Sequence, residues 1–255
     1  MTTTSKINPI TKLTRPIVKQ LIAIALALTS KVEITGRKNI PAAEPFLMVA
    51  NHFSHVDPLL VIHTFPRNLE FWGGLNLPHV PPLLRILPKL WGFYPVNRGG
   101  VSRDAIIAAR NVLAKGGIFG VFPEAGAWAS VLRPARQGAA LLAAQTGVRI
   151  VPVGISGADE VLQNIKRPFY RPSVAVRIGS PIGPFTINGN SRISREELET
   201  ISGQIMRAIA ALLPPERHGV YSDDPVFRAA AQKVAQYPWE DKRELEVTNL
   251  SARNR

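Results

Sequence analysis

The segment of residues 46–50, Phe-Leu-Met-Val-Ala, is apolar at every position. A strand with one face in water alternates apolar and polar side chains, whereas a strand without polar positions is buried on both faces. Strands of that kind occur mostly in parallel sheets that helices cover on both sides. The segment therefore predicts an α/β architecture, and residues 118–122 and 150–155 are further apolar runs of the same kind.

Strand-like and helix-like segments alternate along the chain, which predicts one mostly parallel twisted sheet flanked by helices. We expect strands at residues 32–35, 46–50, 69–72, 118–122, 150–155 and 174–178. We expect helices at residues 14–30, 59–65 and 134–146, another between Ser102 and Gly116, and one opened by a capping box of Ser194 and Glu197.

The pattern favours a single domain at residues 32–215. A basic and apolar helical segment precedes it at residues 1–31, and a tail of unassigned role follows at 216–255. Residues 81–91 combine large apolar side chains with two cations between prolines, which is consistent with a membrane-surface element or with a core element.

The chain has a net charge of +13, and all of it lies before residue 216. Residues 1–215 hold 24 basic against 11 acidic side chains, whereas the tail holds seven of each. A basic globular body predicts an anionic partner, either a phosphate-bearing substrate or an anionic membrane surface. Nucleic acid is not expected, since no nucleic-acid motif appears. The absence of cysteine excludes thiol nucleophiles, disulfides and cysteine-based zinc sites.

The longest apolar run near the N-terminus, residues 21–28, is much shorter than the roughly 18 residues needed to span a bilayer. It follows two cations, Arg15 and Lys19, but no Ala-x-Ala cleavage site comes after it. We therefore interpret residues 14–30 as a helix that packs on the domain or lies in a membrane interface.

Polar residues follow several of the predicted strands, and in a parallel sheet such strand ends meet at one edge. Asn51 and His52 follow one strand, and Asp57 stands five positions after His52. We expect Asp57 to cap the next helix, with Pro58 at its first position. A turn of this kind can bring carboxylate and imidazole together as a general base, although a plain helix cap explains Asp57 equally well. The other polar strand ends are Asn97 with Arg98, and Pro123 with Glu124.

The chain resembles the glycerolipid acyltransferases that carry an Asn-His-x-x-x-x-Asp signature, in particular the 1-acylglycerol-3-phosphate O-acyltransferases. The resemblance spans roughly residues 30–185 and rests on four blocks in the family's order. The blocks lie at residues 51–57, 92–98, 121–124 and 151–155.

The resemblance implies that His52 is the catalytic base and that Asp57 orients it. The base would act on the free hydroxyl of a lysophospholipid, most plainly turning lysophosphatidic acid into phosphatidic acid, with acyl-CoA or acyl carrier protein as the acyl donor. Neither a metal nor a resident cofactor is expected. An enzyme of this kind is expected to be membrane-associated, at the cytoplasmic face.

The same resemblance places the substrate-binding residues in the matching blocks. Arg98 is expected to bind the acceptor phosphate. Backbone N–H groups near Gly126 are expected to stabilise the oxyanion. The remaining substrate-binding positions are Asn51, Ser54 and Glu124.

The third block departs from the family, in which Glu-Gly-Thr-Arg-Ser is usual. Here Glu124 is followed by Ala-Gly-Ala-Trp, so the arginine that helps to bind phosphate is replaced. Arg133 and Arg136 are candidates to substitute for it. The alternatives that stay open are a different lipid acceptor, a thioester or lipid hydrolase, and a non-catalytic lipid-binding protein.

Overall fold

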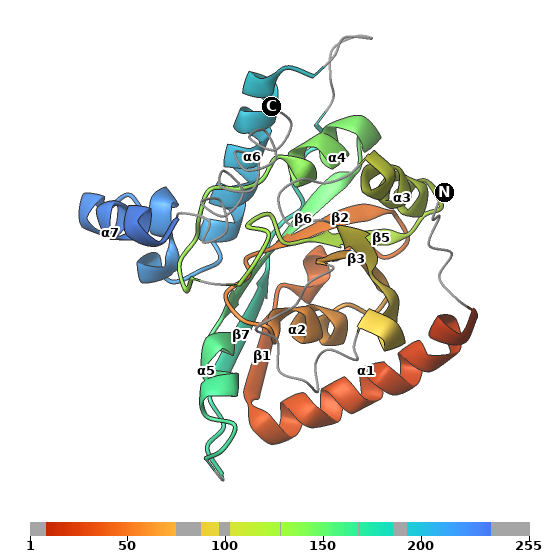
Figure 1. Cartoon of the computed structure of the whole chain (residues 1–255), viewed down its shortest axis with the longest axis vertical. Helices are drawn as coiled ribbons and strands as arrows, with labels where there is room; N and C mark the ends of the chain where they lie inside the picture. The colour runs from red at the N-terminus through yellow and green to blue at the C-terminus, as the bar shows by residue number, and fades with distance from the viewer. Residues whose placement is uncertain are drawn as a thin grey trace, which may run out of the picture.

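A seven-stranded sheet forms the centre of the computed structural model, which describes residues 9–74, 88–96, 103–127, 129–167, 169–185 and 193–235 (Figure 1). The strand order is β1-β7-β6-β2-β5-β3-β4, and every neighbouring pair is parallel except β6 with β7. The predicted mostly parallel sheet is therefore confirmed. The strands are β1 Lys31–Thr35, β2 Phe46–Ala50, β3 Leu69–Gly74, β4 Tyr94–Val96, β5 Ile118–Val121, β6 Arg149–Ser156 and β7 Ser173–Ile178.

Helices cover both faces of the sheet (Figure 1). They are α1 Pro9–Thr29, α2 Asp57–Thr64, α3 Arg103–Ala114, α4 Gly138–Thr146, α5 Ala158–Gln163, α6 Arg195–Ala210 and α7 Pro225–Ala235. One core contains buried side chains of α1, α2 and α5, and the other contains those of α3, α4 and α6. In β2, Met48 packs into the first core and Val49 into the second. The strand is buried at all five positions, as its sequence predicts.

The helix predicted from residue 134 begins later, at Gly138. Tertiary hydrogen bonds engage the backbone of the preceding segment: the N–H groups of Leu132, Arg133 and Arg136 donate to acceptors outside it. These contacts hold the segment against Pro123, Glu124 and Arg217, and the helix begins only after it. The capping box of Ser194 and Glu197 is confirmed, with both reciprocal hydrogen bonds in place.

Hydrogen bonds cross the predicted domain boundary at residue 215 and join the tail to the domain. The carbonyl of Arg217 accepts the N–H of Leu132 at 3.0 Å, and the N–H of Val220 donates to the Leu132 carbonyl at 3.2 Å. The first residues of the tail therefore pack on the domain. Within residues 81–91, only Pro88–Gly92 belongs to a described element, a π-helical turn, and Ser102 lies outside the described residues.

A buried ion pair fastens α1 to the sheet. The guanidinium of Arg15 donates to both carboxylate oxygens of Glu70 in β3, at 2.6 and 2.7 Å. Its Nε donates to the Trp91 carbonyl at 2.9 Å, and its Cζ lies 5.2 Å from the centroid of that indole ring. The helix predicted at residues 14–30 is thus confirmed and packs on the domain.

The opposite face of α1 is apolar and open. None of the described helices is long and apolar enough to cross a bilayer. The exposed large apolar side chains of this face, which we name the α1 stripe, recur every three or four positions. The α1 stripe consists of Leu13, Ile17, Leu21, Ile24 and Leu28.

Removing one partner of the buried pair should destabilise the fold. We expect Glu70→Ala to lower the free energy of unfolding by about 3 to 5 kcal/mol, because the Arg15 guanidinium would stay buried without its counter-charge. The exposed pair of Arg195 and Glu199 is the control, and Glu199→Ala should cost less than about 0.5 kcal/mol. Urea unfolding measures both, and equal losses would contradict the assignment.

Candidate active site

His52 and Asp57 meet at the carboxyl end of β2. Nδ1 of His52 lies 3.0 Å from Oδ2 of Asp57. The imidazole stacks on the ring of Phe122, with centroids 4.5 Å apart and planes 29° apart. The His52 side chain is 16% exposed, whereas Asp57 is fully buried. Of the two imidazole nitrogens of His52, only Nδ1 has a hydrogen-bond partner among the described residues, so Nε2 is available to a substrate.

Asp57 does not cap α2, and that prediction is wrong. Val56 is the N-cap, Asp57 is the first helical residue, and no side-chain capping bond forms. The carboxylate turns back toward the strand instead, where Oδ2 accepts the N–H groups of Phe53 and Ser54, both at 2.8 Å. The turn after β2 points these amides at the carboxylate, so Asp57 organises this turn and not the helix end.

Burial raises the pKa of Asp57, while the His52 imidazole and the N–H groups of Ser54 and Phe53 oppose that rise. All of these donors act on a carboxylate that is shielded from water. In such a site an imidazolium is stabilised more strongly by the carboxylate than at the surface. The pair can therefore hold a proton that His52 takes from a hydroxyl or from water.

Glu124 holds the same turn from β5. Its Oε1 accepts the N–H of His52 at 2.8 Å, and its Oε2 accepts the N–H of Arg133 at 3.2 Å. The Arg133 Nε lies 3.3 Å from Oε2. Burial raises the pKa of Glu124 to about 7, although the Arg133 charge and both N–H groups lower it. Two of the predicted strand ends, those of Asn51 with His52 and of Glu124, are thus joined.

Asn51 and Ser54 serve the backbone around His52. The Asn51 amide bonds both ways with Ile155 of β6, donating to its carbonyl at 2.8 Å and accepting its N–H at 2.7 Å. The Ser54 hydroxyl accepts the N–H of Val56 at 3.2 Å. Like Glu124, both residues are buried, and the contacts give all three a structural task. Their binding of substrate stays a prediction.

Of the predicted phosphate-binding residues, the structure describes Arg133 and Arg136 but not Arg98. Arg98 and its neighbour Asn97 lie outside the described residues. Arg133 is 1% exposed and lies between Glu124 and the Gly126 carbonyl, to which its guanidinium donates. The Arg136 side chain is exposed. Arg136 is therefore the better placed of the two substitutes to meet a ligand.

Two contacts of the site have no signature in the sequence. Phe122 provides the stacking surface for the imidazole, and Arg133 compensates the buried Glu124. A phenylalanine at a strand end and an arginine in a loop are individually common. Only their positions in space reveal their tasks.

Ala125 occupies a backbone conformation that favours glycine. Its φ is 61°, and its N–H donates to the Phe122 carbonyl at 3.0 Å, which closes a tight turn whose central residues are Pro123 and Glu124. A left-handed conformation costs a residue with a Cβ about 1 to 2 kcal/mol. The structure thus explains why glycine suits the position after this glutamate, and shows that alanine adopts the same turn here.

Replacing Ala125 by glycine should relieve this cost. We expect Ala125→Gly to raise the free energy of unfolding by about 1 kcal/mol. Ala108→Gly within α3 is the control and should lower it by about 1 kcal/mol, because glycine is unfavourable inside a helix. Urea unfolding of the wild type and the two variants measures whether each substitution raises or lowers the free energy of unfolding. A loss of stability in both variants would show that Ala125 is not strained.

Comparisons with known proteins agree with this geometry. The family model described as Acyltransferase matches residues 31–156, about half of the chain. A 1-acyl-sn-glycerol-3-phosphate acyltransferase of Borreliella burgdorferi is 28% identical over 62% of this chain and 63% of its own length. One of Saccharomyces cerevisiae is 31% identical over 62% of this chain and 53% of its own length. The alignments thus span less than two thirds of these curated relatives.

A solved structure is similar along more of the chain. It is the 1-acyl-sn-glycerophosphate (LPA) acyltransferase PlsC of Thermotoga maritima, with a TM-score of 0.56 and 25% sequence identity. The match covers 79% of this chain and 80% of that one. The region matched by the family model runs from β1 to the end of β6 and contains His52, Asp57 and Glu124. The chain thus contains an acyltransferase-family domain, which spans residues 31–156.

Proposed function

We propose that this protein transfers a fatty acyl group from acyl-CoA or acyl carrier protein to the free hydroxyl of lysophosphatidic acid, which yields phosphatidic acid. The observation that carries the proposal is the His52 imidazole, which is bound at Nδ1 by a buried Asp57 and has no partner at Nε2 among the described residues. The named relatives, which act on 1-acyl-sn-glycerol-3-phosphate, support this choice of acceptor.

The proposed reaction needs no covalent acyl-enzyme. Nε2 of His52 takes the proton of the acceptor hydroxyl as that oxygen bonds to the thioester carbonyl carbon. Asp57 stabilises the imidazolium that forms, and keeps Nδ1 protonated before and after the step. The C–S bond then breaks, and the imidazolium returns its proton to the leaving sulfur. The products are the ester and the free thiol of the donor.

The tight turn after β5 supports an oxyanion site near Gly126. Glu124 binds the N–H of His52, so the residues that follow it begin at the same strand edge as the imidazole. The tight turn of residues 122–125 reverses the chain there, Ala125 at its end is left-handed, and Gly126 is half-buried. Backbone N–H groups at such a turn are fixed before the reaction begins. Donors that are already in position can stabilise the negative charge that develops on the thioester oxygen.

Substitution of the pair tests the mechanism. We expect His52→Ala and Asp57→Asn to lower the rate of acyl transfer by about 10² to 10⁴-fold, because each removes part of the general base. His63→Ala in α2 is the matched histidine control and should keep the wild-type rate. The assay follows a radiolabelled acyl chain from each donor into lipid.

Two results would count against this mechanism. Wild-type transfer by His52→Ala would refute the assignment of the base. Release of free fatty acid at a rate that does not depend on a lyso-acceptor would identify a hydrolase instead.

We assign the acceptor phosphate to Arg98 and Arg136. The Arg136 side chain is exposed, and its own N–H donates to the Pro123 carbonyl at 2.8 Å, directly before Glu124. Arg136 thus stands beside the strand end that holds the His52 turn. A guanidinium suits a tetrahedral anion because its N–H groups can donate to two oxygens at once.

Acceptors with and without phosphate test these arginines. We expect Arg136→Ala and Arg98→Ala to raise the KM for lysophosphatidic acid about 10-fold or more, the equivalent of one charge-assisted hydrogen bond. The KM for monoacylglycerol should not change. Arg110→Ala, an exposed arginine on α3, is the control and should change neither. An equal effect on both acceptors would refute the phosphate role.

The surface supports docking at the anionic, cytoplasmic face of a membrane. The α1 stripe presents aliphatic side chains along one open helix face, while Arg15 fixes the other face to the domain. A basic body adds attraction to an anionic leaflet. Both substrates carry acyl chains, so a site held at the bilayer would meet them where they are concentrated.

A further inference from the structure

A second exposed apolar surface lies between α5 and β7. We name it the α5–β7 loop, residues 164–167 and 169–172. Phe169 is 101% exposed and has a φ of 65°, and Ile165 and Tyr170 are 59% and 46% exposed. A positive φ is unfavourable for a bulky residue, and exposure of its apolar side chain to water is unfavourable too. No packing contact with the described residues compensates either cost. Such a side chain suits a partner outside the chain.

Cations surround these apolar side chains. Lys166 and Arg167 are exposed within the α5–β7 loop, and Arg171 and Lys31 are exposed at its base. One acid is also present, since the Tyr170 hydroxyl donates to Glu160 at 3.1 Å. Aromatic and aliphatic side chains bordered by lysine and arginine match the chemistry of an anionic lipid interface.

The α5–β7 loop is fastened to the end of α1. Nε and Nη2 of Arg171 donate to the Ser30 carbonyl at 3.2 and 2.9 Å. The N–H of Lys31 donates to the Pro172 carbonyl at 2.9 Å. In Figure 1 this loop projects from the same end of the molecule along which α1 runs. The base of the α5–β7 loop is thus joined by direct hydrogen bonds to the residues that follow α1.

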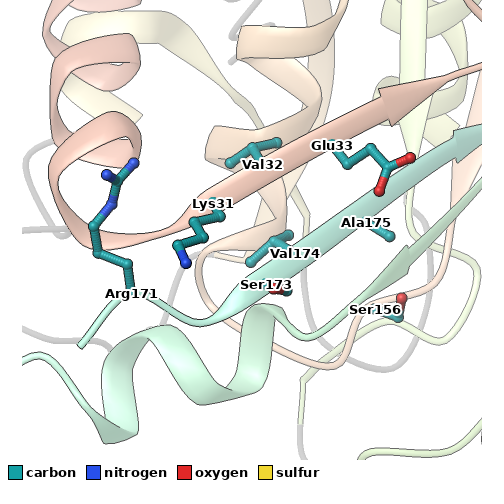
Figure 2. Close-up of a pocket in the computed structure, with 8 residues that line it drawn as sticks. All are labelled: Lys31, Val32, Glu33, Ser156, Arg171, Ser173, Val174 and Ala175. Carbon is teal, nitrogen blue, oxygen red and sulfur yellow. The ribbon is translucent and has the colours of Figure 1, made fainter.

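A shallow pocket lies at this junction. It has a volume of about 520 Å³ and opens over the first residues of β1 and β7. Figure 2 shows the side chains of Lys31 and Arg171 toward one end of the pocket and Glu33 toward the other. The cationic end includes Arg171 of the α5–β7 loop itself, and the phosphate of a lipid headgroup would be attracted there.

The α5–β7 loop is also tied to the catalytic edge. It follows α5, which follows β6, and Ile155 of β6 exchanges two hydrogen bonds with Asn51, the neighbour of His52. The catalytic turn and α5, which leads into this loop, therefore follow the carboxyl ends of adjacent parallel strands. Contact of the loop with a bilayer would bring this edge of the sheet toward the lipid.

We propose that the α5–β7 loop is a second membrane-contact element, which inserts Phe169, Ile165 and Tyr170 into the interface of an anionic bilayer. The proposal rests on the membrane docking proposed for the α1 stripe and adds a separate contact to it. One amphipathic helix leaves a protein free to roll about the helix axis. A second contact beyond the helix end fixes the orientation of the catalytic edge.

Site-specific fluorescence tests the contact, and the absence of native cysteine makes each label unique. The full chain carries an environment-sensitive dye at Phe169→Cys, at Leu21→Cys in the α1 stripe, or at Val226→Cys on α7. Val226 is the control because it is 72% exposed and lies on a separate helix. With phosphatidylglycerol vesicles we expect a blue shift of emission at positions 169 and 21, and none at 226.

The outcomes separate the two proposals. A shift at position 21 without one at 169 would overturn the α5–β7 contact and leave the docking of α1 intact. No shift at either position would overturn both. A shift of equal size at 226 would also overturn the inference, because the signal would then be non-specific.

Charge neutralisation gives a second measurement. We expect Lys166→Gln with Arg167→Gln to weaken partitioning onto anionic vesicles about fivefold for each cation removed. Binding to neutral phosphatidylcholine vesicles and acyl transfer in detergent should not change. Arg195→Gln on α6 is the matched control and should have no effect. An effect equal to that of the control would overturn the proposed role of these cations.

Discussion

Two buried carboxylates, Asp57 and Glu124, hold the turn that carries His52, and the geometry of the site depends on them. Burying a carboxylate is unfavourable unless donors surround it. Asp57 receives the imidazole and two backbone N–H groups, and Glu124 receives the N–H of His52 and the charge of Arg133. Burial raises the pKa of both carboxyls, and the same donors oppose that rise.

The parallel sheet explains why these groups meet. β2 lies between β5 and β6, with all three running in the same direction. The residues after each strand therefore emerge at one edge. Asn51 binds the backbone of β6 and Glu124 arrives from β5, so the catalytic turn is held from both neighbouring strands. A base fixed in this way needs little reorganisation when a substrate arrives.

The helix α1 combines two surfaces with different tasks. Its inner face is fixed by the bidentate pair of Arg15 and Glu70, while its outer face presents the α1 stripe. This inner attachment matters for the proposed docking. Because α1 is fixed to the sheet, the orientation of α1 at the bilayer would also set the orientation of the sheet. The α5–β7 loop, bound to the end of α1 through Arg171, would extend the same surface.

The sequence by itself determined the α/β class, the doubly buried β2, the capping box of α6 and the proximity of His52 to Asp57. These features follow from local periodicity or from residues close together in the chain. The sequence also contained the ordered blocks of the acyltransferase family.

Tertiary structure decided the features that depend on contacts between distant residues. The direction of the Asp57 carboxylate, the burial of Arg133, the exposure of Arg136 and the turn at Ala125 belong to this group. The hydrogen bonds of Glu124 and Asn51 join residues 72 and 104 positions apart. Spacing along the chain does not contain such distances, because they arise only when the strands are ordered in the sheet.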